Sequence, residues 1–434
     1  MTIESILNKY KKGTYEGEYP TVSEEDFTLL KKNFDKLEVK EAFAELFMEY
    51  PIPYADITEE DAYDDFLKLK GFRWSEYLKE GEWFPRKAAE SKYPLTYDGK
   101  QQYFSRINTG NRASNYFQQH NRWSVDGSVS PGPKRTWETK AFMVSLMGAA
   151  YSLKLPQVGK KELRTMIGLR KYICAQFKPN VAKMFYDMNN AKTVLDFSMG
   201  WGDRLAGAFS SETVEHYVGL DPRIENHPFY EQQRDFYTKH TSFFENPTKT
   251  TFYQSPAEDF DYSEYNEYFD VVFTSPPYFS VERYSHDDTQ SWVRYKNIND
   301  WNKNFLHTTL GKIIPTVKKG GIIAVNIADV YASSKGDKGW LEICNPMIDY
   351  LTSQGLTYKG CIGMEMQNIL FGHPKDGLNF FLVGNKCFDT ICSVLFIYTN
   401  IRIIFDISKQ VHKKFDFLFL LLILNFLLNT VHHL

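Results

Sequence analysis

The strongest constraint on the fold is an alternation of short, β-rich apolar segments with helix-like segments between residues 190 and 386. Seven segments have the composition of buried strands: 193–197, 216–221, 250–254, 269–275, 321–327, 356–364 and 379–384. Strands that alternate with helices favour a mostly parallel, doubly wound sheet. The sequence therefore predicts an α/β, Rossmann-like sheet of seven strands with helices on both faces. Its ligands should bind at the carboxyl ends of the strands, near the switch point.

A carboxylate and a glycine-rich turn follow the first predicted strand. Asp196 ends the strand, Ser198 follows it, and Gly200 and Gly202 come next. Glycines let the backbone turn sharply and approach a ligand that a Cβ would hold away. The third glycine of a GxGxxG fingerprint would fall at Leu205, so the dinucleotide pattern is broken.

Two more carboxylates follow the second and third predicted strands. Asp221 ends the second strand, where it could accept hydrogen bonds from ribose hydroxyls; a helix cap or a turn acid is the alternative. Asp259 follows the third strand and could accept from the exocyclic amine of an adenine, or could equally be a turn acid.

The fourth predicted strand runs into the tetrapeptide Ser275-Pro276-Pro277-Tyr278. Two prolines keep this segment extended and non-helical, so its carbonyl groups can face a ligand. The Ser275 hydroxyl oxygen and the Pro276 carbonyl would then offer two acceptors to one NH2 group. Accepting its protons aims the lone pair of a poorly nucleophilic ring amine at an electrophilic methyl group, while Tyr278 stacks on the base.

Taken in order, these motifs resemble the S-adenosylmethionine-dependent DNA amino-methyltransferases that act on N4 of cytosine or N6 of adenine. The segment 176–180, Gln-Phe-Lys-Pro-Asn, is similar to the upstream element that packs on the methionine part of the cofactor in that family. The motif order is similar to the family's gamma arrangement, and the resemblance covers about residues 165–386. It assigns cofactor binding to Phe177, Pro179, Asp196, Ser198, Gly200, Gly202, Asp221 and Asp259, and catalysis to Ser275, Pro276, Pro277 and Tyr278.

The resemblance implies methyl transfer from S-adenosylmethionine to the amino group of a base flipped out of DNA. Serine at the first position of the tetrapeptide leans toward N4 of cytosine in that family. Gamma members often carry a recognition domain after the catalytic core, for which no room exists after residue 386. Recognition is therefore expected from residues 1–160 and from the loop at 281–300, where Arg283, Tyr284 and Trp292 are candidates for stacking and base flipping.

Charge is unevenly distributed along the 434 residues, whose net charge is -3. Residues 1–99 carry a net charge of -8, residues 100–185 one of +12, and the remainder one of -7. Basic and aromatic residues alternate in the middle segment, which suits a surface that neutralises phosphates and stacks on bases. A solvated face over core aromatics is the alternative. The predicted nucleic-acid contacts are Arg106, Arg112, Arg122, Trp123, Lys134, Arg135, Arg283 and Tyr284.

The sequence lacks the residues that two other base-modifying enzyme classes need. No Cys follows a Pro, as the nucleophile of a C5-cytosine methyltransferase would, and the PCxxC ligands of a zinc deaminase are missing. The remaining alternatives are methylation of an RNA base, methylation of a protein Gln, which the serine and the basic segment disfavour, and an idle nucleic-acid-binding relative. Five cysteines without a CxxC pair predict no metal site or disulfide scaffold, and no secretory signal is evident, so an intracellular location is expected.

Three regions are predicted: a mostly helical, acidic N-terminal region with a loop at 108–135 (residues 1–160), the transferase domain (161–386) and an apolar tail outside the fold (387–434). The longest apolar run of the tail has 12 residues interrupted by Asn425, too few for the roughly 20 that a membrane span needs. The tail lacks Gly, Ala and Pro, the residues with GC-rich codons. It is therefore interpreted as read-through into AT-rich non-coding sequence.

Overall fold

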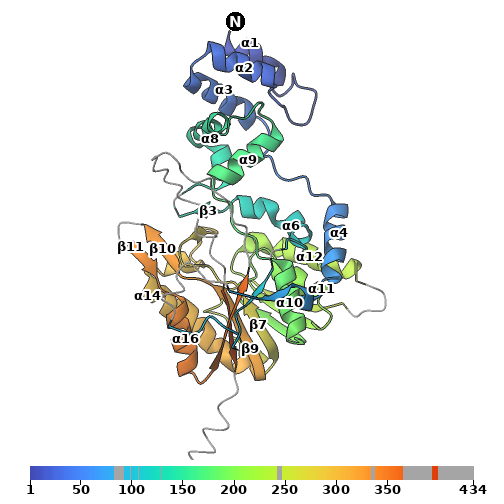
Figure 1. The fold of residues 1–434 in the computed structure, drawn as a ribbon, viewed down its shortest axis with the longest axis vertical. Helices are drawn as coiled ribbons and strands as arrows, with labels where there is room; N and C mark the ends of the chain where they lie inside the picture. Colours follow the sequence, from blue (N-terminus) through green and yellow to red (C-terminus); the bar gives the residue numbers. More distant parts are fainter. Residues whose placement is uncertain are drawn as a thin grey trace, which may run out of the picture.

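The computed structural model describes residues 1–82, 92–97, 99–105, 107–128, 130–241, 247–333, 338–364 and 393–398. Two parts are visible in the ribbon: a small group of helices that carries the N-terminus, and a larger part built around a sheet (Figure 1). The predicted motifs lie in the larger part, so its sheet decides where they meet.

Nine strands form this sheet among the described residues, in the order β1-β2-β12-β13-β9-β7-β4-β5-β6. They are β1 (Leu78–Glu80), β2 (Gln102–Phe104), β4 (Thr193–Asp196), β5 (His216–Leu220), β6 (Lys249–Tyr253), β7 (Phe269–Thr274), β9 (Val317–Ile327), β12 (Thr357–Met364) and β13 (Ser393–Tyr398). Strands β6, β5, β4, β7 and β9 are parallel, whereas β13 is antiparallel to both β9 and β12. The prediction of a mixed α/β, Rossmann-like sheet is confirmed.

Alternate residues of the central strands face two separate apolar cores. Val271 and Phe273 of β7 lie in one core, and Val272 between them lies in the other. The first core includes side chains of α10 (Pro179–Met188), α11 (Asp203–Ser210) and α12 (His227–Lys239); the second includes those of the π-helix η5 (Trp301–His307), α15 (Thr308–Ile313) and α16 (Cys344–Ser353). Helices thus cover both faces, which explains the near-continuous apolar character of these strands.

The direction of strand order reverses between β4 and β7. From β4 the chain proceeds to β5 and β6 on one side, then returns to β7 on the other side of β4. In open α/β sheets, ligands bind beyond the carboxyl ends of the strands at such a switch point. Asp196 is the last residue of β4, and Ser275 directly follows Thr274 at the end of β7. The glycine turn and the tetrapeptide therefore start at neighbouring strand ends.

Residues 1–160 divide between the two parts of the molecule. A separate core is formed by α1 (Ile3–Leu7), α2 (Glu24–Asn33), α3 (Lys36–Met48), α7 (Pro133–Glu138), α8 (Lys140–Ser152) and α9 (Lys160–Arg170). Helices α4 (Glu59–Lys70) and α6 (Asn111–Trp123) instead pack on α11 and α12, and their Phe66 and Phe117 join the core of the sheet. Part of the N-terminal region is therefore built into the domain that carries the motifs.

Two predictions about these elements are wrong. Residues 108–135 are not mostly loop, because α6 occupies 13 of them and α7 begins at Pro133. The Asn, Gln and Ser residues that suggested a loop are in part buried hydrogen-bonding groups on α6, among them Gln118 and Asn121. Among the described residues the sheet has nine strands rather than seven: six of the predicted segments form strands, β1 and β2, of three residues each, extend the sheet beyond β12, and Ser393–Tyr398 adds β13. Such short edge strands have too few residues to show a pattern.

The boundary at residue 387 also needs correction. The strand predicted at 379–384 lies outside the described residues, whereas Ser393–Tyr398, within the stretch expected to lie outside the fold, forms β13 between β9 and β12. Within the described part of the chain, no helix has the length and apolar character required to cross a bilayer.

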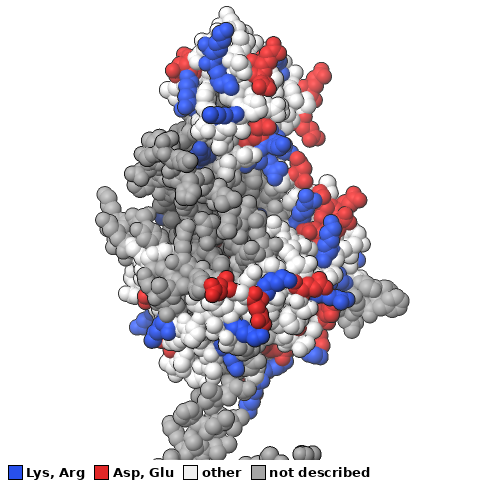
Figure 2. All heavy atoms as spheres, viewed as in Figure 1, with Lys and Arg blue, Asp and Glu red and all other residues white. Residues whose placement is uncertain are grey.

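The basic middle of the chain packs against the acidic N-terminal helices. Helix α8 lies against α3 and α6 against α4. Ion pairs join Lys140 to Glu45 at 2.6 Å, Lys160 to Asp56 at 2.5 Å and Arg112 to Asp61 at 2.8 Å. Blue and red side chains accordingly lie side by side over the N-terminal helices in Figure 2. Each such exposed pair contributes only about 0–1 kcal/mol, but the three pairs neutralise Lys140, Lys160 and Arg112 locally, so these three side chains are not free cations.

The close contact between Gly360 of β12 and the Thr96 carbonyl can be tested by substitution. Its φ is +121°, and a Cβ there would lie 1.7 Å from the Thr96 carbonyl oxygen; Gly355 has φ +88° with open space around it. We expect Gly355→Ala to lower the free energy of unfolding by about 1 kcal/mol through backbone strain alone. Gly360→Ala should lower it by about 3 kcal/mol or more, since a clash is added. Urea denaturation measures both; equal losses would contradict the close contact with Thr96.

Candidate functional site

A buried ion pair lies under the switch point. Asp196 is 0% exposed, and its carboxylate accepts hydrogen bonds from Arg204 Nε at 2.8 Å, Tyr217 Oη at 2.6 Å and Thr274 Oγ1 at 2.9 Å. These donors come from α11, β5 and β7. Arg204, 3% exposed, also donates to the Ser198 carbonyl. The carboxylate predicted to bind a cofactor is thus hydrogen-bonded to donors from the protein itself. It connects α11, β5 and β7 beneath the site.

The glycine turn is shaped by two left-handed residues and by the second predicted acid. Gly200 has φ +57° and Gly202 has φ +70°, and a Cβ on Gly202 would lie 2.1 Å from Gln233 Oε1. The Gly200 amide donates to Asp221 Oδ2 at 2.9 Å, and the Arg223 amide donates to Asp221 Oδ1 at 2.9 Å. Burial raises the pKa of Asp221, although these two amides and His227 oppose the rise. The structure therefore brings Asp221 and the glycine turn together, and the role of Asp221 toward a ribose stays a prediction.

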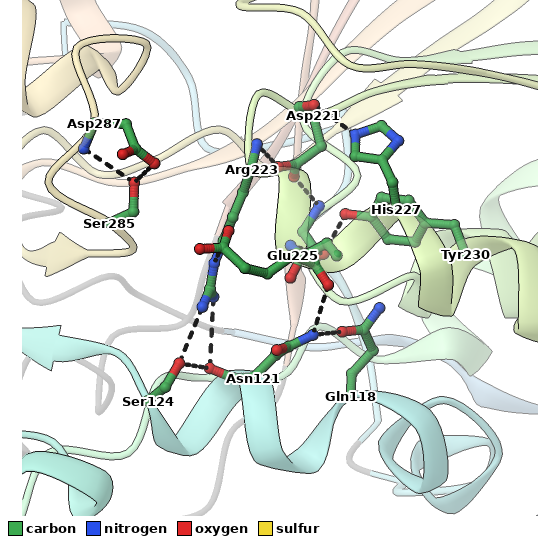
Figure 3. A network of polar contacts seen from close by, with 12 residues as sticks. Gln118, Asn121, Ser124, Asp221, Arg223, Glu225, His227, Tyr230, Ser285 and Asp287 are labelled. Carbon is green, nitrogen blue, oxygen red and sulfur yellow. Dashed lines mark hydrogen bonds and ion pairs between the residues drawn. The ribbon is translucent and has the colours of Figure 1, made fainter.

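Helix α6 reaches this corner of the site through Arg223. The Arg223 guanidinium donates to Ser124 Oγ at 3.0 Å and lies over the Trp201 ring, 5.5 Å from its centroid. Asn121 of α6 donates to Gln118 Oε1 at 2.8 Å, and Figure 3 shows Arg223 extended between Asp221 and these α6 residues. The sequence analysis did not predict these contacts with α6, because residues 108–135 were expected to be mostly loop.

A second buried acid, also missed, lies at the start of α11. Asp203 is 1% exposed; its Oδ1 accepts from Ser114 of α6 and, at 2.9 Å, from Gln176 Nε2 of the upstream element. No partner for its Oδ2 exists among the described residues. Burial raises the pKa of Asp203, opposed by the two donors and by Arg122 and Arg204. A buried carboxylate oxygen without a donor is costly unless a ligand supplies one.

The upstream element packs against α11 and the end of β7. The Phe177 ring covers the Arg204 guanidinium at 5.0 Å and contacts the Phe273 ring edge to face at 5.6 Å. Pro179 is the first residue of α10 and is buried. The amide of Asn180, next to it, is fully buried, and neither of its polar atoms has a partner within the described residues.

The tetrapeptide is held by a residue that the sequence did not single out. Asn326 of β9 donates from Nδ2 to Ser275 Oγ at 3.0 Å and to Tyr278 Oη at 3.0 Å. Pro276 is buried, and Phe279 has φ +52°, a left-handed conformation that strains an aromatic residue. Such strain concentrates at functional sites. No sequence signal except a lone polar residue in an apolar strand pointed to Asn326.

Asp259 lies at an exposed position after β6. Its carboxylate pairs with Arg294 NH1 at 2.7 Å, and the same guanidinium pairs at 3.1 Å with Glu258, which is 5% exposed. Burial raises the pKa of Glu258. The predicted role of Asp259 toward an adenine thus competes with this ion pair.

The predicted nucleic-acid residues do not form one surface. Trp123 is 6% exposed and packs on Tyr54, which corrects its prediction as a stacking residue. Arg122 donates to the Cys174 carbonyl at 2.9 Å, so it serves an internal contact. Three more are exposed but have acidic partners, namely Arg112 with Asp61, Lys134 with Glu138 and Arg135 with Asp126. Arg106 lies outside the described residues.

The loop after the tetrapeptide is tied to the N-terminal region. Its strand β8 (Glu282–Arg283) pairs with β3 (Asp126–Gly127). The Tyr284 hydroxyl donates to Glu282, and its ring lies 5.8 Å from that of Trp201, centroid to centroid; its predicted contact with nucleic acid stays a prediction. Arg283 instead lies over the Trp292 ring at 5.2 Å, and Lys296 lies over the same ring at 5.4 Å. One aromatic ring with two cations is therefore present directly after the tetrapeptide.

Comparison with known proteins gives limited information. No protein-family model and no curated protein matches the sequence. Among solved structures, TrmN from Thermus thermophilus is similar at 11% identity and a TM-score of 0.33, over 51% of this chain and 49% of TrmN. The cyclase SpnF is similar at 12% identity and a TM-score of 0.30, over 43% of this chain and 59% of its own length. A putative RNA methyltransferase from Pyrococcus horikoshii is similar at 10% identity and a TM-score of 0.32, over 54% and 88%.

This chain thus spans about half the length of TrmN and 59% of that of SpnF. At these TM-scores the likenesses assign no activity, and chains of one fold serve different chemistries.

The pKa of Asp203 leads to a prediction. Since burial raises it in the folded state, the wild type loses stability as pH rises from about 4, the pKa range of an unfolded Asp, through the folded pKa. Asp203→Asn removes this loss. The unfolding free energy of the variant relative to wild type should therefore rise between about pH 4 and pH 8 in urea denaturation.

Asp261 is the control for this experiment. A hydrogen bond from the Ser263 amide lowers the pKa of this exposed carboxylate, so its contribution to stability is lost as pH falls. The relative stability of Asp261→Asn should change with pH in the opposite direction. The same trend in both variants would contradict the buried position of Asp203.

Proposed function

We propose that this protein transfers a methyl group from S-adenosylmethionine to the exocyclic amino group of a base flipped out of DNA, with N4 of cytosine favoured over N6 of adenine. The observation that carries the proposal is the position of Ser275-Pro276-Pro277-Tyr278. It directly follows β7, next to β4 and its glycine turn, at the switch point of a Rossmann-like sheet.

The residues around the glycine turn fit such a cofactor. The Asp221 carboxylate accepts one amide on each oxygen, which leaves lone pairs for a ribose diol. Asp203 Oδ2, buried and without a donor among the described residues, suits the ammonium group of a methionine part. Ile224, 57% exposed three residues after Asp221, offers an apolar contact for an adenine. Phe177 covers Arg204 and lines the upstream side.

The chemistry needs no covalent intermediate with the protein. S-adenosylmethionine supplies a methyl group on a sulfonium; on transfer the C–S bond electrons stay with sulfur, while the lone pair of the amino nitrogen forms the N–C bond. Ser275 Oγ and the Pro276 carbonyl each accept a hydrogen bond from one N–H group of the amine, which directs the nitrogen lone pair toward the methyl group. The extra proton of the methylated nitrogen leaves to water, since a serine hydroxyl is not a base at neutral pH.

Substrate contact is assigned to the loop after the tetrapeptide. Arg283 and Lys296 flank Trp292, and no carboxylate within the described residues pairs with either cation. The ring supplies a stacking surface and the cations can neutralise phosphates, the combination by which proteins bind extruded or single-stranded nucleotides. Arg112, Arg135 and Lys140 of the middle segment, by contrast, already have acidic partners.

The tetrapeptide supplies the first test. Ser275→Ala and Tyr278→Ala should each lower methyl transfer by about a hundredfold or more, since each removes a group that contacts the amine or the base. Binding of S-adenosylmethionine, measured by calorimetry, should stay within about twofold because neither residue lies at the glycine turn.

Transfer is measured with tritiated S-adenosylmethionine on unmethylated genomic DNA and on total RNA, followed by digestion to nucleosides. N4-methylcytosine or N6-methyladenine in DNA supports the proposal. A methylated base found in RNA alone would mean that the substrate is RNA rather than DNA. Ser263→Ala, an exposed serine near β6, is the matched control. Full turnover in both tetrapeptide variants would refute the assignment, and donor binding without any transfer by wild type would identify an idle relative.

The loop supplies the second test. Arg283→Gln and Lys296→Gln should each weaken binding of a mixed-sequence oligonucleotide and reduce the slope of log K against log salt by about one. Fluorescence anisotropy between 50 and 200 mM NaCl measures this with DNA and RNA probes. Lys140→Gln, whose lysine pairs with Glu45, is the control and should change the slope little. Loss in the control but not in the loop variants would move the contact surface back to the middle segment.

A further inference from the structure

Asn326 is the only polar side chain in an otherwise apolar strand end. Residues 321–327 of β9 read Gly-Ile-Ile-Ala-Val-Asn-Ile, and all of them are buried. Asn326 is 3% exposed, and its Oδ1 has no hydrogen-bond partner among the described residues. A buried amide oxygen without a donor costs about 1–3 kcal/mol. Folding alone would favour leucine or valine here, so the amide has another use.

Both hydrogens of the amide are directed at the tetrapeptide. Nδ2 lies 3.0 Å from Ser275 Oγ and 3.0 Å from Tyr278 Oη, the first and last residues of the segment. The register explains the contact: Thr274 of β7 is opposite Val325 of β9, so Ser275 follows directly beside Asn326. A primary amide has two N–H donors, and the two hydroxyl oxygens use both.

The tetrapeptide needs this contact because its own backbone lacks donors. Pro276 and Pro277 have no N–H, so the ladder hydrogen bonds that hold β7 cannot continue through them. The left-handed φ of Phe279 then turns the chain away. A side-chain donor that bridges residues 275 and 278 fixes the spacing that the missing amides leave undefined.

We propose that Asn326 is a positioning residue that clamps Ser275 and Tyr278 in one geometry and sets which lone pair of the serine hydroxyl faces the substrate. One lone pair of Ser275 Oγ accepts from Asn326, so the other remains for a single N–H of the target amine. The same amide fixes the Tyr278 ring, which keeps the stacking plane and the acceptor in register. Only the effect on rate rests on the proposed function; the clamp itself does not.

The clamp can be measured without turnover. Tyr278 is replaced by 3-fluorotyrosine through codon suppression, and the pKa of its phenol is read by 19F NMR. A donor to the oxygen stabilises the phenolate, so Asn326→Leu should raise the phenol pKa by about half a pH unit or more. Asn326→Asp, which places a carboxylate beside the oxygen, should raise it further. The same phenol pKa in wild type and both variants would overturn the clamp.

Asn302 provides a matched control. It is also a buried asparagine, 6% exposed, whose Nδ2 donates to the Glu342 carbonyl at 2.9 Å and whose Oδ1 has no partner within the described part of the chain. It lies in the π-helix, and its Nδ2 donates to the Glu342 carbonyl rather than to the tetrapeptide. Asn302→Leu makes the same chemical change and should leave both the phenol pKa of Tyr278 and methyl transfer unchanged.

The rate effect is tested in the same variants. Asn326→Leu should lower kcat by about tenfold to a hundredfold, with the KM for S-adenosylmethionine unchanged within about twofold, because the glycine turn is not altered. Tyr278→Phe, which keeps the ring and loses one of the two contacts, should have a smaller effect. An unchanged kcat in Asn326→Leu would overturn the positioning role. If wild type transfers no methyl group to DNA or RNA, the proposed function fails, while the 19F series still decides the clamp.

Discussion

The ion pair between Asp196 and Arg204 sets the geometry on which the site depends. Both side chains are almost fully buried, so their desolvation is costly and is offset only by complete hydrogen bonding. Tyr217 and Thr274 complete the shell of the carboxylate. Loss of one member would leave an uncompensated charge in the sheet, at a cost of several kcal/mol.

This cluster also aligns the two halves of the site. Arg204 donates to the Ser198 carbonyl and so holds the entry of the glycine turn, while Thr274 is the residue before the tetrapeptide. Since side chains alternate along a strand, Ser275 lies on the face of the sheet opposite to Thr274. There Ser275 meets Asn326 of β9. One buried carboxylate thus places the glycine turn and the tetrapeptide relative to each other.

Local patterns predicted the sheet and the strand ends, but not the contacts between distant segments. The glycine turn, Asp221 and Ser275 were found because each follows an apolar run, and parallel strands bring their carboxyl ends together. Three polar residues of the site were not predicted, namely Asp203, Asn326 and Ser114. The role of a buried polar residue depends on its partner, which the sequence does not show. The role of the basic middle segment was predicted from its charge and its interleaved aromatic residues. Its acidic partners lie about 50 to 100 residues away, and only the packing of helices reveals them.

Glu282 limits how the loop after the tetrapeptide can move. Its carboxylate accepts hydrogen bonds from Tyr172 and Tyr284, from Cys174 Sγ at 3.1 Å and from the Ala175 amide at 3.3 Å. Burial raises the pKa of the Tyr172 phenol and the Cys174 thiol, so both remain protonated donors at neutral pH.

The segment 172–175 leads directly into Phe177, and β3 of the N-terminal region pairs with the same two residues that form β8. A Cβ on Gly127 of β3 would lie 2.8 Å from the Tyr172 ring, so these three segments are packed without spare room. The loop after the tetrapeptide, the segment before the upstream element and the N-terminal region therefore meet at Glu282. These contacts hold the loop as far as Tyr284, and the part beyond it carries Trp292 and Lys296.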